Sequence, residues 1–290
     1  MQVHGYYSYW IAVYSCLFVK VAFGWIPATH RISDFSQARR YASHGVNGHV
    51  GESPAANSAS FSNALVYYQS NDDPKGRSLS FQEKSSQTVP LQLQAAQETF
   101  NWCAHFVVPH NLCPWAAQSV GANQAIRIYV VNDKDSMTKA LTVVSQQFYE
   151  DLTTSSVDPN TAIAFVVMVT QDSDSQNYWS FQDYYDWYVE QEDDWLDAAE
   201  DDEEHTANFV IWAPFHPGFQ FEGDDERLQF EKQSPCPTVS IVSSAVIDAA
   251  GPATTALIAK NNQEILRKKT VSQWQELYDA SVRLSKATKD

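Results

Sequence analysis

The chain contains few basic residues. It has 19 Lys and Arg against 35 Asp and Glu, which gives a formal net charge of −16 over 290 residues. Nucleic-acid affinity depends on clustered Lys and Arg that neutralise phosphates, and the sequence has no basic stripe. The same sign of charge disfavours anionic membrane surfaces. We therefore expect no nucleic-acid partner and, once the leader described below is removed, no membrane partner.

Cysteine is scarce, and nucleotide-binding motifs are missing. The four cysteines are unevenly spaced and include no Cys-x-x-Cys pair: Cys16, Cys103, Cys113 and Cys236. This spacing argues against a disulfide framework, a zinc ribbon and a thioredoxin-like site. Neither a P-loop nor a Gly-rich dinucleotide fingerprint is present. The sequence indicates no particular cofactor and leaves protein partners unknown.

The first part of the chain has the composition of a targeting sequence. Tyr6 to Ala22 is mostly apolar, is short for a membrane span and fits a signal-peptide core. From Phe23 to about Ser70 the chain is rich in Ser, Ala and Asn and poor in acid, which resembles the bipartite plastid presequences of algae with secondary plastids. We expect a leader over 1–22, a transit-like and disordered linker over 23–90, and a plastid location. The alternatives are a secreted or a mitochondrial protein.

The rest of the chain, 91–290, alternates between helical and strand patterns. Helices are expected over Ala95–Val108, Asp135–Leu152, Tyr178–Ala198 and Thr255–Lys268, and after a capping box at Ser272 and Gln275. Strands are expected over Ala125–Val131, Thr161–Val169 and Asn208–Trp212, while Val239–Ala249 fits either element and slightly favours helix. Such alternation predicts a single α/β domain, a sandwich in which helices cover a small, at least partly parallel sheet.

Two short boxes carry the best candidate catalytic residues, Cys113 and His216. Asn111 to Trp115 sets Cys113 in a turn before a proline, and Phe215 to Phe221 sets His216 at a strand end before another proline. Cys113 is either a nucleophile or metal ligand, or a buried thiol packed at the turn. His216 is either a general base or ligand, or a ring bonded to a loop carbonyl. If the boxes meet, they form a thiolate–imidazole pair or part of a metal set with Cys236 or His110.

Other residues are expected to line a pocket between the boxes. Arg127 lies mid-strand, where it either holds an anion or pairs with a carboxylate. Asn111 is a further candidate ligand contact, and an apolar wall is expected from Trp115, Phe215, Phe219 and Phe221. The acidic run Glu190–Glu204 is expected to be a solvated surface because it lacks the spacing of a calcium loop.

Several boxes together resemble a family of unknown function, DUF1415, found widely in bacteria and plants. The resemblance runs from about Thr99 to Leu266 and rests on Asn111–Trp115, Phe215–Gly223, Ser234–Pro237 and Asn261. It implies a shared fold but supplies no agreed activity.

The chain departs from this family's pattern at five positions. Gln233 replaces a usual Arg and Cys236 a usual Tyr, while Ser240, Ser243 and Ser244 stand where a His and an Arg-Glu pair are typical. Retention of both boxes favours a soluble organellar domain that binds a small molecule at a Cys113/His216 pocket, with enzyme activity left open. Loss of three ionisable groups favours a non-catalytic interaction or assembly domain with a degenerated site.

Overall fold

The computed structural model describes residues 64–69, 81–83, 90–122, 125–154, 158, 161–169, 179–200, 206–220 and 225–283. The expected leader, most of the expected linker and Phe221 lie outside these residues.

One mixed, six-stranded sheet organises the domain, in the order β2-β1-β3-β4-β6-β5. Its strands are β1 Leu65–Gln69, β2 Phe81–Glu83, β3 Ile126–Val131, β4 Ile163–Met168, β5 Val210–Phe215 and β6 Thr238–Ser243. The pairs β1–β3 and β3–β4 are parallel, whereas β1–β2, β4–β6 and β6–β5 are antiparallel. The prediction of a single α/β domain with a partly parallel sheet is confirmed.

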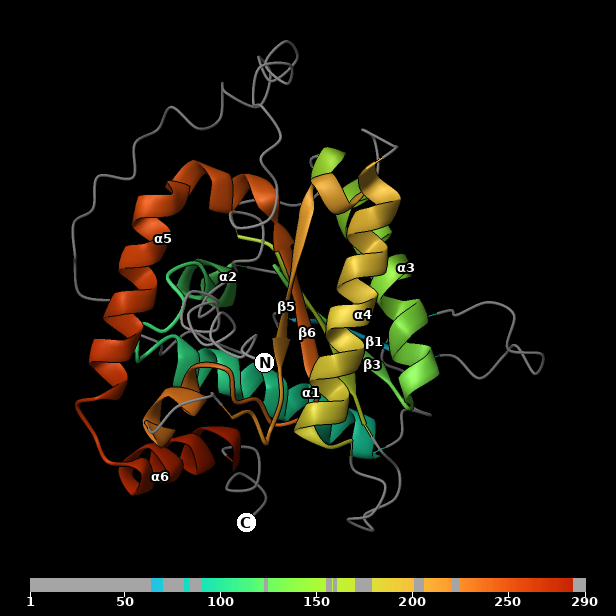
Figure 1. Ribbon diagram of the computed structural model, residues 1–290. Coiled ribbons are helices and arrows are strands. Elements are labelled where there is room, and N and C mark those ends of the chain that lie inside the picture. The colour runs from blue at the N-terminus through green and yellow to red at the C-terminus, as the bar shows by residue number, and fades with distance from the viewer. Residues whose placement is uncertain are drawn as a thin grey trace, which may run out of the picture.

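Helices cover both faces of this sheet (Figure 1). One face packs against α1 Pro90–Trp102, the π-helix η5 Cys103–Val107, α2 Ala116–Gly121, α5 Ser244–Leu266 and α6 Val271–Val282. The other packs against α3 Lys134–Thr153 and α4 Phe181–Glu200. Two 3₁₀ turns, η6 Thr206–Asn208 and η7 Glu226–Glu231, flank the last two strands. We call the first face the cavity face and the second the aromatic face.

The alternation of side chains along each strand divides the core in two. In β4, Ile163, Phe165 and Val167 belong to the cavity-face cluster, while Ala164, Val166 and Met168 belong to the aromatic-face cluster. All six residues are buried, because helices cover both faces of this central strand. A nearly continuous apolar run is the pattern that such a strand requires.

The sheet begins earlier than the expected domain start at Leu91. β1 and β2 lie inside the segment expected to be linker, yet β1 pairs in register with β3 over four residues. Leu65 to Tyr68 is a short apolar and aromatic run in polar surroundings, so a periodicity argument gives it little weight. The cross-strand partner, distant in sequence, decides its structure.

Two further predictions near the C-terminus are corrected. The slight preference for helix over Val239–Ala249 is wrong for its first half, because β6 occupies Thr238–Ser243 between β4 and β5. α5 then starts at Ser244 and continues past Gly251, where a φ of 74° marks a kink. The capping box lies two residues earlier than expected: the Thr270 hydroxyl accepts the Gln273 N–H at 3.2 Å, and the Gln273 side chain accepts the Thr270 N–H at 3.0 Å.

Candidate functional site

The first box ends the long helix α1–η5 by a helix-capping turn. Asn111 has a positive φ of 53°, the left-handed conformation that commonly closes helices. The Asn111 N–H bonds the Val108 carbonyl at 3.0 Å, and the Leu112 N–H bonds the Val107 carbonyl at 3.0 Å. This is the double hydrogen-bond pattern of a Schellman motif. Asn111 is exposed, so its role here is to turn the chain and aim Leu112 and Cys113 inward.

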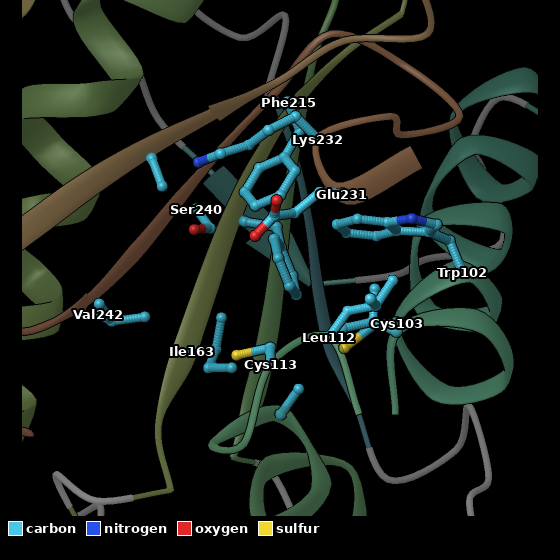
Figure 2. Close-up of a pocket in the computed structure, with 14 residues that line it drawn as sticks. Trp102, Cys103, Leu112, Cys113, Ile163, Phe215, Glu231, Lys232, Ser240 and Val242 are labelled. Carbon is cyan, nitrogen blue, oxygen red and sulfur yellow. The ribbon is translucent and has the colours of Figure 1, made fainter. Parts of the chain in front are cut away.

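Cys113 lines a small cavity between the cavity face of the sheet and the η5 helix (Figure 2). The cavity has a volume of about 50 Å³, which is room for a few water molecules or one very small ligand. Strand residues Ile163, Phe165 and Val242 form apolar lining, and Phe215 and Trp102 add aromatic rings 5.2 Å apart. The π-helix Cys103–Val107 borders the same space, and π-turns of this kind occur frequently at functional sites.

Two charged side chains, Glu231 and Lys232, also line this apolar cavity. Each residue is 5% exposed. Figure 2 shows the Glu231 carboxylate pointing among the lining residues, with the Lys232 side chain running along Phe215. The Lys232 ammonium lies 5.0 Å from the centre of the Phe215 ring, and Glu231 Oε1 accepts a 2.8 Å hydrogen bond from Asn262 Nδ2. Side chains of opposite charge therefore sit in one buried space.

The thiol of Cys113 is held protonated by its surroundings. Burial raises the pKa of Cys113, while the backbone N–H groups of Trp115 and Ala116 and the charge of Lys232 act in the opposite direction. Cys113 follows one helix, but it also directly precedes α2, so N–H groups rather than carbonyls face its sulfur. Of the two alternatives for Cys113, the contacts match the buried thiol, whose pKa is governed mainly by desolvation.

His216 lies on the aromatic side of the sheet and is 2% exposed. Its Nδ1 accepts the Gly218 N–H at 3.0 Å, so the ring proton is on Nε2, which donates to the Trp179 carbonyl at 3.0 Å. The ring packs against Tyr184 and Phe181 of α4. Burial lowers the pKa of His216 to about 4, and the bond to Trp179 opposes this shift. These contacts match the structural alternative, a ring bonded to a loop carbonyl.

Cys113 and His216 therefore contact opposite faces of the sheet. Phe215 belongs to the cavity-face cluster, and the next residue, His216, points the other way toward α4. Cys113 packs with the cavity-face cluster. Neighbouring strand residues point to opposite faces, so the thiolate–imidazole pair is not assembled.

Arg127 also lies away from the cavity. It pairs with Asp151 of α3 on the aromatic side, in a hollow of about 400 Å³ that Tyr67 and Tyr129 also line. The rings of Tyr67 and Tyr129 stack with centres 4.7 Å apart. Of the two alternatives for Arg127, pairing with a carboxylate is the one observed.

The expected apolar wall is only partly assembled. Phe215 lines the cavity, but Phe219 packs on Phe181 of α4, with ring centres 4.6 Å apart. Trp115 packs at the edge of the cavity-face core, where its carbonyl accepts the backbone N–H groups of Gln118 and Ser119 at the start of α2. Phe221 lies outside the described residues.

The positions that depart from the family pattern have separate roles. Ser240 is buried and lines the cavity, while Ser243 precedes α5 and the Ser244 hydroxyl bonds the Asn208 carbonyl at 3.2 Å. The Gln233 side chain donates to the Pro217 carbonyl at 3.1 Å, which connects the Ser234–Pro237 box to the box from Phe215 to Phe221. Burial raises the pKa of Cys236 to about 12. Of these five positions, Ser240 is the one that could contact a ligand in the cavity.

Sequence reasoning missed the residues that give the cavity its polarity. Glu231, Lys232 and Trp102 attracted no attention, and Asn261 was singled out where its neighbour Asn262 is the buried residue. Asn262 Nδ2 also bonds the Leu112 carbonyl at 2.8 Å, across 150 residues of sequence. A usable signal was the charged doublet Glu231-Lys232, which stands directly before Gln233 and the Ser234–Pro237 box.

Within the described part of the chain, no group of three or more His, Cys, Asp or Glu residues is arranged to hold a metal ion. None of the helices described is both long and apolar enough to cross a bilayer.

The fold and the site define a single-domain α/β protein with a small apolar cavity that two opposite charges border. The chain belongs to the family described as Protein of unknown function (DUF1415), whose family model matches residues 94–276. The matched range includes the cavity lining and begins after β1 and β2. Neither a comparison with curated proteins nor one with solved structures gave a match.

Proposed function

We propose that the protein binds a small molecule in the cavity beside Cys113. The observation that carries this proposal is the placement of Glu231 and Lys232, each 5% exposed, in a space otherwise lined mainly by apolar side chains. Ligand sites in proteins are concave and mostly apolar, with a few convergent polar groups that orient the ligand. The cavity has this composition.

The energetic cost of these charges supports a role in binding. Removing an ionised side chain from water costs several kcal/mol, and apolar side chains of similar volume often serve stability as well or better. A charged ligand in the cavity would offset part of the cost of burying Glu231 and Lys232.

Binding without covalent catalysis fits this site best. Burial keeps the Cys113 thiol protonated, and His216 is bonded on the opposite side of the sheet. A nucleophile requires an adjacent base or a lowered pKa. Neither partner of the expected pair meets this requirement in the described structure.

A second candidate function is an interaction or assembly domain whose site has degenerated. The cavity volume favours it, because about 50 Å³ is far below the roughly 300–1,000 Å³ of common ligand pockets. Under this alternative, Glu231 and Lys232 are remnants of a larger site.

A cavity-filling substitution tests the proposal. The full chain would be screened by ligand-observed NMR against a library of very small fragments, alongside a Ser240→Leu variant that fills the cavity. Ser244→Leu is the matched control, since Ser244 is outside the cavity lining. We expect fragment hits that Ser240→Leu abolishes and Ser244→Leu preserves. If no hit depends on the cavity, the small-molecule function is wrong and the assembly alternative stands.

We also propose that the protein works in a plastid. The support is the apolar segment before Phe23 and the Ser-rich, acid-poor stretch after it. Residues 1–63 fused to a fluorescent protein in an alga with a secondary plastid should deliver the fusion to that organelle. Fluorescence confined to the secretory pathway or to mitochondria would refute this location.

A further inference from the structure

We infer that the ligand of the cavity is a small zwitterion, in which an ammonium and a carboxylate flank a short apolar body. This inference rests on the proposed binding function and names its ligand class. The small α-amino acids have this chemistry. Three features of the lining support it: a fixed anion, a fixed cation, and apolar walls close to both.

The anionic side of the site is Glu231. Asn262 is 1% exposed, and its Nδ2 donates to both Glu231 Oε1 and the Leu112 carbonyl at 2.8 Å. These bonds fix the carboxylate relative to the turn that carries Cys113. A preorganised carboxylate attracts an ammonium group strongly in a space lined mainly by apolar side chains.

The cationic side of the site is Lys232. Its backbone is held at both ends, because its N–H bonds the Gln229 carbonyl at 3.0 Å and its carbonyl accepts the His216 N–H at 3.1 Å. The side chain then runs along the Phe215 ring. Its ammonium is a hydrogen-bond donor, so it suits the carboxylate oxygens of a ligand.

The combination of both charges sets the specificity. A simple carboxylate would be attracted by Lys232 but repelled by Glu231, and a simple amine would meet the reverse situation. A molecule that carries both groups places its ammonium near Glu231 and its carboxylate near Lys232, so neither group faces a like charge. Repulsion between like charges then rejects the ligands that carry only one of the two groups. The small volume and the apolar Ile163 and Val242 restrict the body of the ligand to a few carbon atoms.

Three molecules of similar size test this ligand class on the full chain. Alanine carries both charged groups, propionate lacks the ammonium, and ethylamine lacks the carboxylate. Dissociation constants would be measured by calorimetry or NMR titration at neutral pH. We expect alanine to bind at least about tenfold more tightly than either of the others, a difference of ~1.4 kcal/mol.

Charge-removing variants identify the side chains responsible. Glu231→Gln keeps an oxygen for Asn262 and should abolish the preference for alanine over propionate. Lys232→Met should abolish the preference over ethylamine. Glu264→Gln and Lys260→Met are matched controls, because these two residues are 57% and 71% exposed on α5. The controls should bind alanine as the unmodified chain does.

Two outcomes separate this inference from the proposed function. If propionate or ethylamine binds as tightly as alanine, or if none of the three binds while cavity-dependent fragments do, the zwitterion is wrong and the cavity function survives. If no ligand depends on the cavity, both are wrong. Because the three-ligand comparison uses the unmodified chain, a variant that fails to fold does not prevent the decision.

Discussion

The two faces of the sheet hold their buried charged groups in different settings. On the aromatic face, the buried Arg127 pairs with Asp151 of α3. On the cavity face, Glu231 and Lys232 are each 5% exposed and line a small cavity together with apolar side chains. The aromatic face therefore carries an ion pair between a strand and a helix, and the cavity face carries two opposite charges at the edge of a cavity.

The irregular backbone of this domain gathers on the cavity face. The π-helix η5 and the left-handed residue Asn111 follow each other in the segment that positions Cys113. Sparsely populated conformations persist where the surrounding structure determines them, and they cluster at binding sites. The difference between the faces therefore supports the proposal that a ligand binds on the cavity face and that His216, on the other face, serves stability.

The largest expected effect tests this assignment for His216. Its pKa is about 4 in the folded protein and 6.5 when unperturbed, so between these values the unfolded chain binds a proton that the folded chain excludes. The stability that His216 contributes is complete above about pH 6.5 and is lost as the pH falls toward 4. A shift of this size corresponds to about 3 kcal/mol. Urea unfolding at several pH values would measure the free energy of unfolding.

His216→Gln should remove this part of the pH dependence. His110→Gln is the matched control: His110 packs on Phe106 and Trp274 on the cavity side, and its pKa is also lowered, by burial first and by Lys269 second. We expect the slope of stability against pH between 4 and 6.5 to fall more in His216→Gln than in the control. Equal slopes in the unmodified protein and in His216→Gln would contradict the structural role.

A smaller effect on the free energy of unfolding is expected for the two charged residues on the cavity face. If Glu231 and Lys232 serve binding, replacing both with Met should leave the free energy of unfolding unchanged or raise it by up to about 2 kcal/mol, because two buried charges are removed. The same double variant should lose all cavity-dependent ligand binding. A fall in stability of several kcal/mol would instead show that these charges hold the fold together.

The fold was predictable where local pattern and tertiary context agree. β3, β4 and β5 were located because their apolar runs are bounded by turns, and α3 and α4 because their apolar stripes have helical spacing. β6 was missed because Val239–Ser243 merges into an Ala-rich helix, and its strand structure depends on β4 and β5 as neighbours. Nothing local distinguishes these alternatives, since pairing partners far along the chain decide between them.

The candidate site was predictable at Cys113 and little beyond it. Phe215 and His216 were both expected in one pocket, although adjacent strand residues point to opposite faces, and the same rule separates Arg127 from Ile126 and Ile128. That error was avoidable from the sequence. The contribution of Asn262 was not, because its bonds to Leu112 and Glu231 depend on how α5 packs against the rest of the domain.

The smallest expected effect concerns Asn111, whose backbone conformation closes the helix and whose side chain is a candidate ligand contact. Its φ of 53° is readily adopted by Gly and costs a residue with a β-carbon about 1 kcal/mol, with Asn among the least penalised. Asn111→Ala should lower the free energy of unfolding by about 1 kcal/mol, and Asn111→Gly should leave it nearly unchanged. Urea unfolding of the two variants beside the unmodified protein would measure both changes.

The binding behaviour of the same two variants decides what the asparagine is for. If Asn111 acts through the turn alone, Asn111→Gly keeps the Schellman hydrogen bonds and the orientation of Cys113 toward the cavity. Cavity-dependent ligand binding should then be preserved. If Asn111→Gly is stable but binds about tenfold more weakly, the amide itself contacts the ligand. The site would then extend from the buried cavity to the exposed rim of the turn, and the cavity face would contribute surface as well as interior to recognition.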